Sequence, residues 1–95
     1  MSSVNSDPVK LPGDFDVSPA FMAAVRNQTE IRIPMLVHDT LYRAKDILGK
    51  AYWQRLSKWE ALLAGHCIAY LAMREELPLR KAGKRPDNSI VYVLM

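Results

Sequence analysis

Residues 57–95 read SKWEALLAGHCIAYLAMREELPLRKAGKRPDNSIVYVLM, and this stretch decides the fold. Ser57 and Glu60 have the spacing of a capping box, in which each side chain accepts a hydrogen bond from the other residue's backbone N–H. The helix that they begin should span Lys58–Glu76, because Pro78 keeps the residue before it out of the helical region. Its middle is apolar almost all round, which is typical of a helix buried on several sides.

Two strands are predicted after this helix, over Leu77–Ala82 and Ser89–Leu94. Between them, Pro86-Asp87-Asn88 has the chemistry of a turn, because proline presets φ and the next two residues tolerate left-handed backbone. The second strand is rich in β-branched and aromatic residues. The chain should therefore end in a β-hairpin.

The preceding residues predict two more helices and a short strand. Ser18-Pro19 is a helix start, and that helix should fade by Asn27-Gln28. The alternation at Ile31–Ile33 indicates a short strand, and apolar spacing predicts a helix over Asp39–Leu48. Lys50–Leu56 should be a connection with at most one helical turn.

The order of these elements predicts a small α+β domain of the winged helix-turn-helix type, with three helices and a C-terminal β-hairpin as the wing. The strand at Ile31–Ile33 could pair with the wing as a third strand. Residues 18–95 should form this single domain. Residues 1–17 are polar, with Pro and Gly, and should form a flexible N-terminal arm.

The last fifty or so residues resemble small phage and bacterial proteins with a winged-helix-like core. The resemblance implies a nucleic-acid-binding or regulatory adaptor protein of phage or mobile-element origin. The chain differs from that pattern at His66-Cys67, where a basic residue would follow the central glycine. The resemblance is carried by Asp46-Ile47-Leu48, Trp53, Leu56, Gly65, Leu77-Pro78-Leu79, Gly83-Lys84-Arg85, Asp87-Asn88-Ser89, Tyr92 and Leu94.

Positive charge is concentrated in the second half of the chain. The net charge is +3, with three bases against five acids in residues 1–40 and ten bases against five acids in residues 41–95. This balance indicates a polyanion or an acidic protein surface as the partner. Together with the basic wing it predicts double-stranded DNA, bound through its phosphates with little sequence reading. We expect DNA contacts from Arg55, Lys58, Arg80, Lys81, Lys84 and Arg85.

A protein partner is the alternative. The predicted helix has more apolar side chains than the rest of one small domain can bury, and surplus apolar surface is usually covered by a partner. The chain would then inhibit or adapt a larger nucleic-acid-handling complex. The same excess predicts a homodimer, with Trp59, Leu63 and Tyr70 in the interface.

Catalytic, metal and cofactor roles are not expected. His66 and Cys67 lie about 100° apart on a helix and cannot easily share a metal ion. Cys67, the single cysteine, should be a buried, inert core residue. No reaction has a complete set of residues, so we expect a transcription regulator rather than an enzyme. No signal peptide or membrane span is recognisable, and we expect a cytoplasmic protein.

Overall fold

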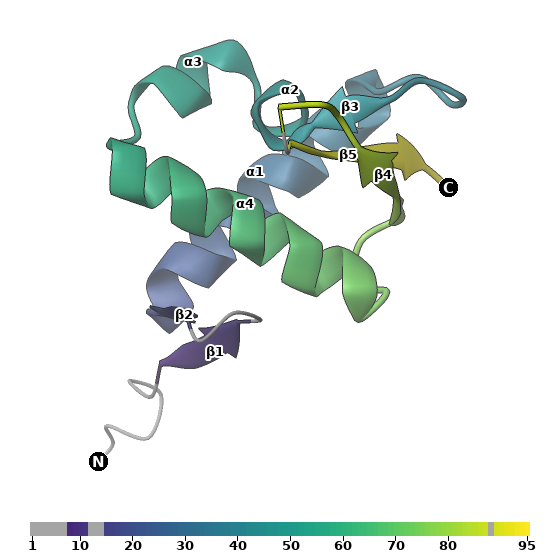
Figure 1. The fold of residues 1–95 in the computed structure, drawn as a ribbon. Helices are drawn as coiled ribbons and strands as arrows, with labels where there is room; N and C mark the ends of the chain where they lie inside the picture. Colours follow the sequence, from purple (N-terminus) through teal and green to yellow (C-terminus); the bar gives the residue numbers. More distant parts are fainter. Residues whose placement is uncertain (1–7, 12–14, 88) are drawn as a thin grey trace.

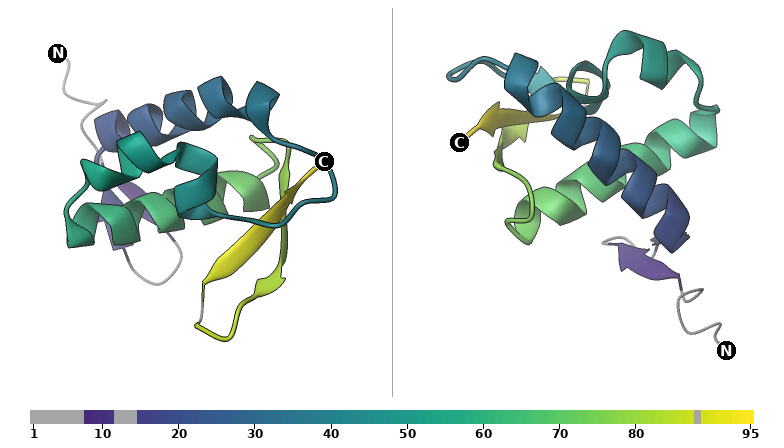
Figure 2. Two further views of the ribbon diagram at one scale, coloured as in Figure 1. Left: turned by 90° about the horizontal axis from the view of Figure 1, so that it is seen from above. Right: turned by 180° about the vertical axis from the view of Figure 1, so that it is seen from behind.

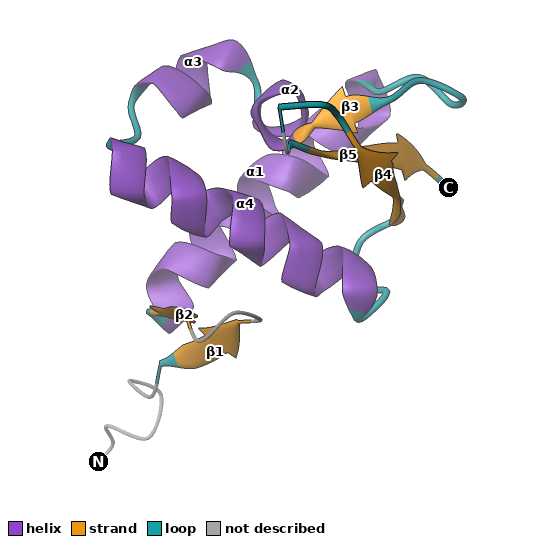
Figure 3. Cartoon of the chain, in the orientation of Figure 1, coloured by secondary structure: helices purple, strands orange, loops and turns teal. Residues whose placement is uncertain are grey.

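The computed structural model describes residues 8–11, 15–87 and 89–95. These residues form a small α+β domain with four α-helices, one short 3₁₀ helix and two antiparallel sheets (Figure 3). The prediction of three helices was therefore one too low. The additional helix is α3, Lys50–Gln54, which fills the expected connection.

The longest helix is α4, Lys58–Met73, and it begins as the sequence predicts. The Ser57 hydroxyl accepts from the Glu60 N–H at 3.1 Å, and the Glu60 carboxylate accepts from the Ser57 N–H at 2.9 Å. Its buried face carries Leu63, Ala64, Cys67, Ile68 and Leu71. In Figure 1, α4 crosses in front of α1.

The first helix, α1, Pro19–Arg32, continues beyond its predicted end into the 3₁₀ helix η2, Ile33–Met35. The prediction of a strand at Ile31–Ile33 was therefore wrong. Two side chains of this last part of α1 bind the end of the short helix α2, Ala44–Leu48. Gln28 donates to the Leu48 carbonyl at 2.8 Å, and Arg32 donates to the Ile47 carbonyl at 3.2 Å. Carbonyls at a helix end lack partners within their own helix, so these contacts favour a longer α1.

A third strand does pair with the C-terminal hairpin, but it lies at β3, Tyr42–Arg43. A helix was predicted over Asp39–Leu48, but the observed helix α2 begins only at Ala44 because the residues before it form a turn and β3. The sheet has the order β3-β5-β4, with β4 at Leu79–Lys84 and β5 at Ile90–Leu94. Tyr42 pairs with Tyr92, and Leu79 pairs with Leu94.

The described part of the N-terminal arm forms a hairpin of β1, Val9–Leu11, and β2, Phe15–Val17. Leu11 and Val17 are buried in the core. The prediction of a flexible arm was wrong for these residues, because the apolar residues of both strands pack against the domain. Residues 1–7 and 12–14 of the arm lie outside the described residues.

Candidate functional site

The wing, formed by β4, β5 and the turn between them, presents the four bases expected of it. Arg80, Lys81, Lys84 and Arg85 are all exposed. None of them forms an ion pair with another residue in the described part of the chain. The wing projects away from the helices (Figure 2, left). Its charges are therefore available to a large anionic partner.

Two hydrogen bonds join described residues on the two sides of the turn between β4 and β5. The Ser89 N–H donates to the Asp87 carboxylate at 3.0 Å, and the Arg85 N–H donates to the Ser89 carbonyl at 2.8 Å. Hydrogen bonds from the Ser89 hydroxyl and backbone lower the pKa of Asp87, and the nearby positive charges of Arg43 and Arg85 lower it further. The turn therefore carries one negative charge among its bases near neutral pH.

Arg55 and Lys58 form a second group of bases at the junction of α3 and α4. Both are exposed. The junction lies at the first end of α4, whereas the wing lies beside the other end (Figure 1). The six expected DNA contacts are therefore divided between two separate positions on the surface.

The outer face of α4 offers little to read a base. Between Glu60 and Tyr70, His66 is its only polar side chain apart from the buried Cys67. His66 is stacked on Phe15 of β2, with the ring centroids 4.2 Å apart and the planes 25° apart. Leu62, in contrast, is 46% exposed. Base edges are recognised by hydrogen-bonding side chains, and between Glu60 and Tyr70 this face offers only His66.

The three expected interface residues lie in different environments. Trp59 is 57% exposed, and its ring lies 5.8 Å from that of Phe15. Tyr70 is half-buried, with the Arg74 guanidinium 5.3 Å from its ring centroid. Leu63 was wrongly placed in the interface, since it is only 9% exposed and belongs to the core. An almost wholly apolar helix gives no sequence signal of which face is buried.

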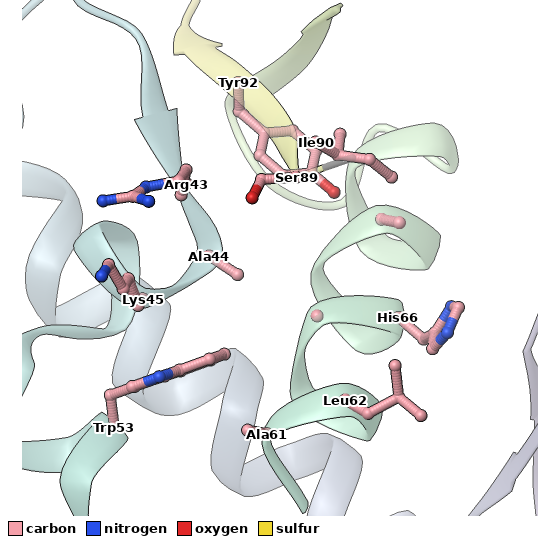
Figure 4. A pocket seen from close by; sticks show the side chains of 12 residues that line it. Arg43, Ala44, Lys45, Trp53, Ala61, Leu62, His66, Ser89, Ile90 and Tyr92 are labelled. Atoms are coloured by element: carbon pink, nitrogen blue, oxygen red, sulfur yellow. The ribbon is translucent and has the colours of Figure 1, made fainter. Parts of the chain in front are cut away.

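A groove of about 500 Å³ runs along α4 and was not anticipated. Its floor is α4, its opposite wall comes from β3, α2 and α3, and β5 closes one end (Figure 4). The groove brings together segments that are far apart in the sequence. It is lined by Arg43, Ala44, Lys45, Trp53, Ala61, Leu62, Gly65, His66, Ala69, Ser89, Ile90 and Tyr92.

A second unexpected feature is a set of exposed apolar side chains from the end of α1 to the residue before β3. This set comprises Ile31, Met35, Val37 and Leu41.

Cys67 is fully buried, as expected, and burial raises the pKa of its thiol to about 11. A thiol of this kind is almost entirely protonated near neutral pH, so it is a poor nucleophile and metal ligand. Among the described residues, no three His, Cys, Asp or Glu side chains are grouped so that they could hold a metal ion. Within the same part of the chain, no helix combines the length and apolarity needed to cross a bilayer.

Comparison of the chain with families of known proteins, with curated proteins and with solved structures gives no match. The function is therefore inferred from the residues of this chain alone.

Proposed function

We propose that the chain is a winged-helix DNA-binding protein that acts as a regulator. The order α1, β3, α2, α4, β4, β5 and the sheet order β3-β5-β4 support this fold. In such a fold, α4 is the recognition helix and the β4–β5 hairpin is the wing. The short α3 is an additional turn in the connection between α2 and α4.

The observation that carries the proposal is the charge of the wing. Four of the six residues from Arg80 to Arg85 are basic, exposed and without an ion-pair partner in the described part of the chain. Each Lys or Arg that meets a phosphate releases a condensed counterion, and this release drives DNA binding. Arg55 and Lys58 would add phosphate contacts at the other end of α4.

The binding mode should be largely independent of sequence. Phosphate contacts position a protein on DNA, but only contacts to base edges specify a sequence. The outer face of α4 supplies few such contacts, and the Glu60 carboxylate at its beginning repels phosphate. We therefore expect similar affinities for DNA duplexes of different sequence.

Fluorescence anisotropy with a labelled random-sequence duplex, measured over a series of salt concentrations, tests this proposal. Changing Arg80, Lys81, Lys84 and Arg85 together to Ala should weaken binding at low salt. It should also flatten the log–log salt dependence by about 3–4 units, since each phosphate contact contributes roughly 0.9. A wild-type protein without measurable affinity at low salt would refute the proposal.

A charge-matched pair of variants separates the wing from the general effect of net charge. Lys84→Ala/Arg85→Ala and Lys10→Ala/Lys50→Ala each remove two exposed positive charges. Only the first pair should reduce the salt dependence by about two units. Equal losses in both variants would show that the wing has no special role.

A homodimer would strengthen DNA binding by linking two weakly binding wings. The exposed Trp59 supports self-association, because a large aromatic ring open to solvent is often part of an interface. Leu63 has no part in this contact, since it is enclosed within one subunit.

A further inference from the structure

Gly65 lies in the middle of α4, and no contact or backbone conformation of the described residues requires a glycine there. A Cβ atom added at this position would meet nothing within 4 Å, and the backbone there does not have a positive φ. Glycine inside a helix is nonetheless less favourable than alanine, because it loses more backbone freedom on folding. The missing side chain therefore leaves space next to the helix, and that space is part of the groove.

The floor of the groove carries small residues at the spacing that allows a second helix to pack closely. Ala61 and Ala69 lie one helical turn before and after Gly65, so a floor of small residues extends for about 12 Å. The Trp53 ring and Ala44 face this floor from the opposite side (Figure 4). Small side chains let two helices approach closely, because the distance between packed axes depends on the side chains at the contact.

The rim of the groove has a net positive charge. Arg43 and Lys45 belong to the lining, and no carboxylate does. Lys84 pairs across the hairpin with the lining residue Ile90, and the backbone of Arg85 is bonded to Ser89, another lining residue. The nearest opposing charges are Asp46, 3.6 Å from Arg43 Nε, and Asp87 at the tip of the wing.

Arg43 has only a long-range partner at this rim. Its Nε atom lies 3.6 Å from an Asp46 carboxylate oxygen, which is within ion-pair distance but forms no hydrogen bond. The Arg43 side chain is 30% exposed.

We propose that this groove binds a short amphipathic helix of another protein, with an apolar face toward α4 and acidic residues along its flanks. This is the helix-in-groove mode of recognition. A second copy of the chain fits less well, because two rims of net positive charge would then face each other. DNA fits less well, because His66 is the single hydrogen-bonding side chain that α4 contributes to the floor. The proposal does not depend on DNA binding by the wing.

Two synthetic peptides of about 14 residues, or four helical turns, test the proposal. Both carry Leu on one face, and the remaining positions are Glu in one peptide and Lys in the other. In ¹⁵N NMR titrations of the full chain, the acidic peptide should shift the amide signals of Ala61, Gly65 and Ala69. It should bind at least about tenfold more tightly than the basic peptide. Equal binding of both peptides, or no shifts with about 1 mM acidic peptide, would overturn the proposal.

Gly65→Leu should fill the groove without disturbing the core, because the added side chain enters open space. It should weaken binding of the acidic peptide by at least about tenfold. Ala24→Leu, at an exposed position of α1, is the matched control and should bind as the wild type does. Unchanged peptide binding by Gly65→Leu would overturn the proposal.

Lys45→Glu provides a second variant, at an exposed position where loss of folding is not expected. This variant should bind the acidic peptide more weakly and the basic peptide more tightly than the wild type does. If neither affinity changes, the charge argument is contradicted. Duplex DNA distinguishes this site from the wing. Gly65→Leu should keep its DNA affinity within about twofold, whereas loss of DNA binding would show that the groove belongs to the DNA surface instead.

Discussion

Replacing two glycines of this chain by alanine should change its stability in opposite directions. Gly65 lies inside α4 with open space beside it, whereas Gly49 lies between α2 and α3 with a φ of 93°. The same chemical change, one added methyl group, therefore meets two different physical situations.

Gly65→Ala should stabilise the fold. Alanine loses less backbone entropy than glycine on forming a helix, which gives about 0.5–1 kcal/mol. No clash offsets this gain, since a Cβ atom there has no neighbour within 4 Å. For a domain of this size, the gain raises the melting temperature by about 2–8 °C.

Gly49→Ala should destabilise the fold for two reasons. With φ 93° and ψ 147°, the backbone is in a region that is nearly exclusive to glycine, where another residue costs about 1–3 kcal/mol. The added Cβ would also lie 3.2 Å from Arg32 Nε. Arg32 would have to move away from the Ile47 and Asp46 carbonyls, to which it donates at 3.2 and 3.3 Å. The total loss should be about 2–4 kcal/mol.

Urea and thermal unfolding, followed by far-UV circular dichroism at several protein concentrations, measure both effects. A lower stability for Gly65→Ala at every concentration would refute the open groove, because it would mean that another part of the same chain fills that space. An unchanged stability for Gly49→Ala would refute the backbone conformation at the α2–α3 junction.

The buried Cys67 should react slowly with a thiol reagent in the folded protein and quickly in urea, and rapid stoichiometric labelling of the folded protein would show that it is accessible. Burial raises the pKa of Cys67 from 9.0 to about 11 and that of Tyr92 from 10.0 to about 12. The unfolded chain then loses these protons first, so the free energy of unfolding should fall from pH 9 to 12, and Cys67→Ala should reduce the fall between pH 9 and 11. Light scattering should show a dimer that Trp59→Ala weakens, whereas a monomer at high concentration would contradict self-association.

Local signals in the sequence predicted the parts of the fold that local contacts determine. The capping box of α4 needs only Ser57 and Glu60, and both of its hydrogen bonds are present. The C-terminal hairpin follows in the same way from a turn between two β-forming segments. These predictions succeeded because their physical causes lie within a few residues of each other.

The errors concern elements that distant contacts determine. Ile31–Ile33 alternates like a strand, but Gln28 and Arg32 hold this part of the chain as a helix against the end of α2. Tyr42 and Arg43 become a strand only because β5 provides backbone partners about fifty residues away. The alternation of polar and apolar residues along the sequence cannot reveal either contact.

The two candidate sites differ in the same way, since one is formed by neighbouring residues and the other by residues far apart in the sequence. The bases of the wing are adjacent in sequence, and a hairpin exposes them together, so they could be identified from the sequence. The groove needs Trp53, Gly65 and Tyr92 to meet from three elements, and no spacing in the sequence indicates that they do.

The two proposed surfaces share part of their charge, and this sharing links their functions. Lys84 and Arg85 contribute to the wing and also lie next to the groove-lining residues Ile90 and Ser89. A cation that meets a phosphate cannot at the same time neutralise a carboxylate of a bound helix, so on the two proposals each partner should weaken binding of the other. The two effects must also be equal in size, because the coupling free energy between two sites is reciprocal. An acidic partner helix should therefore weaken DNA binding even without a change in the conformation of the domain, because it competes for two of the six proposed phosphate contacts.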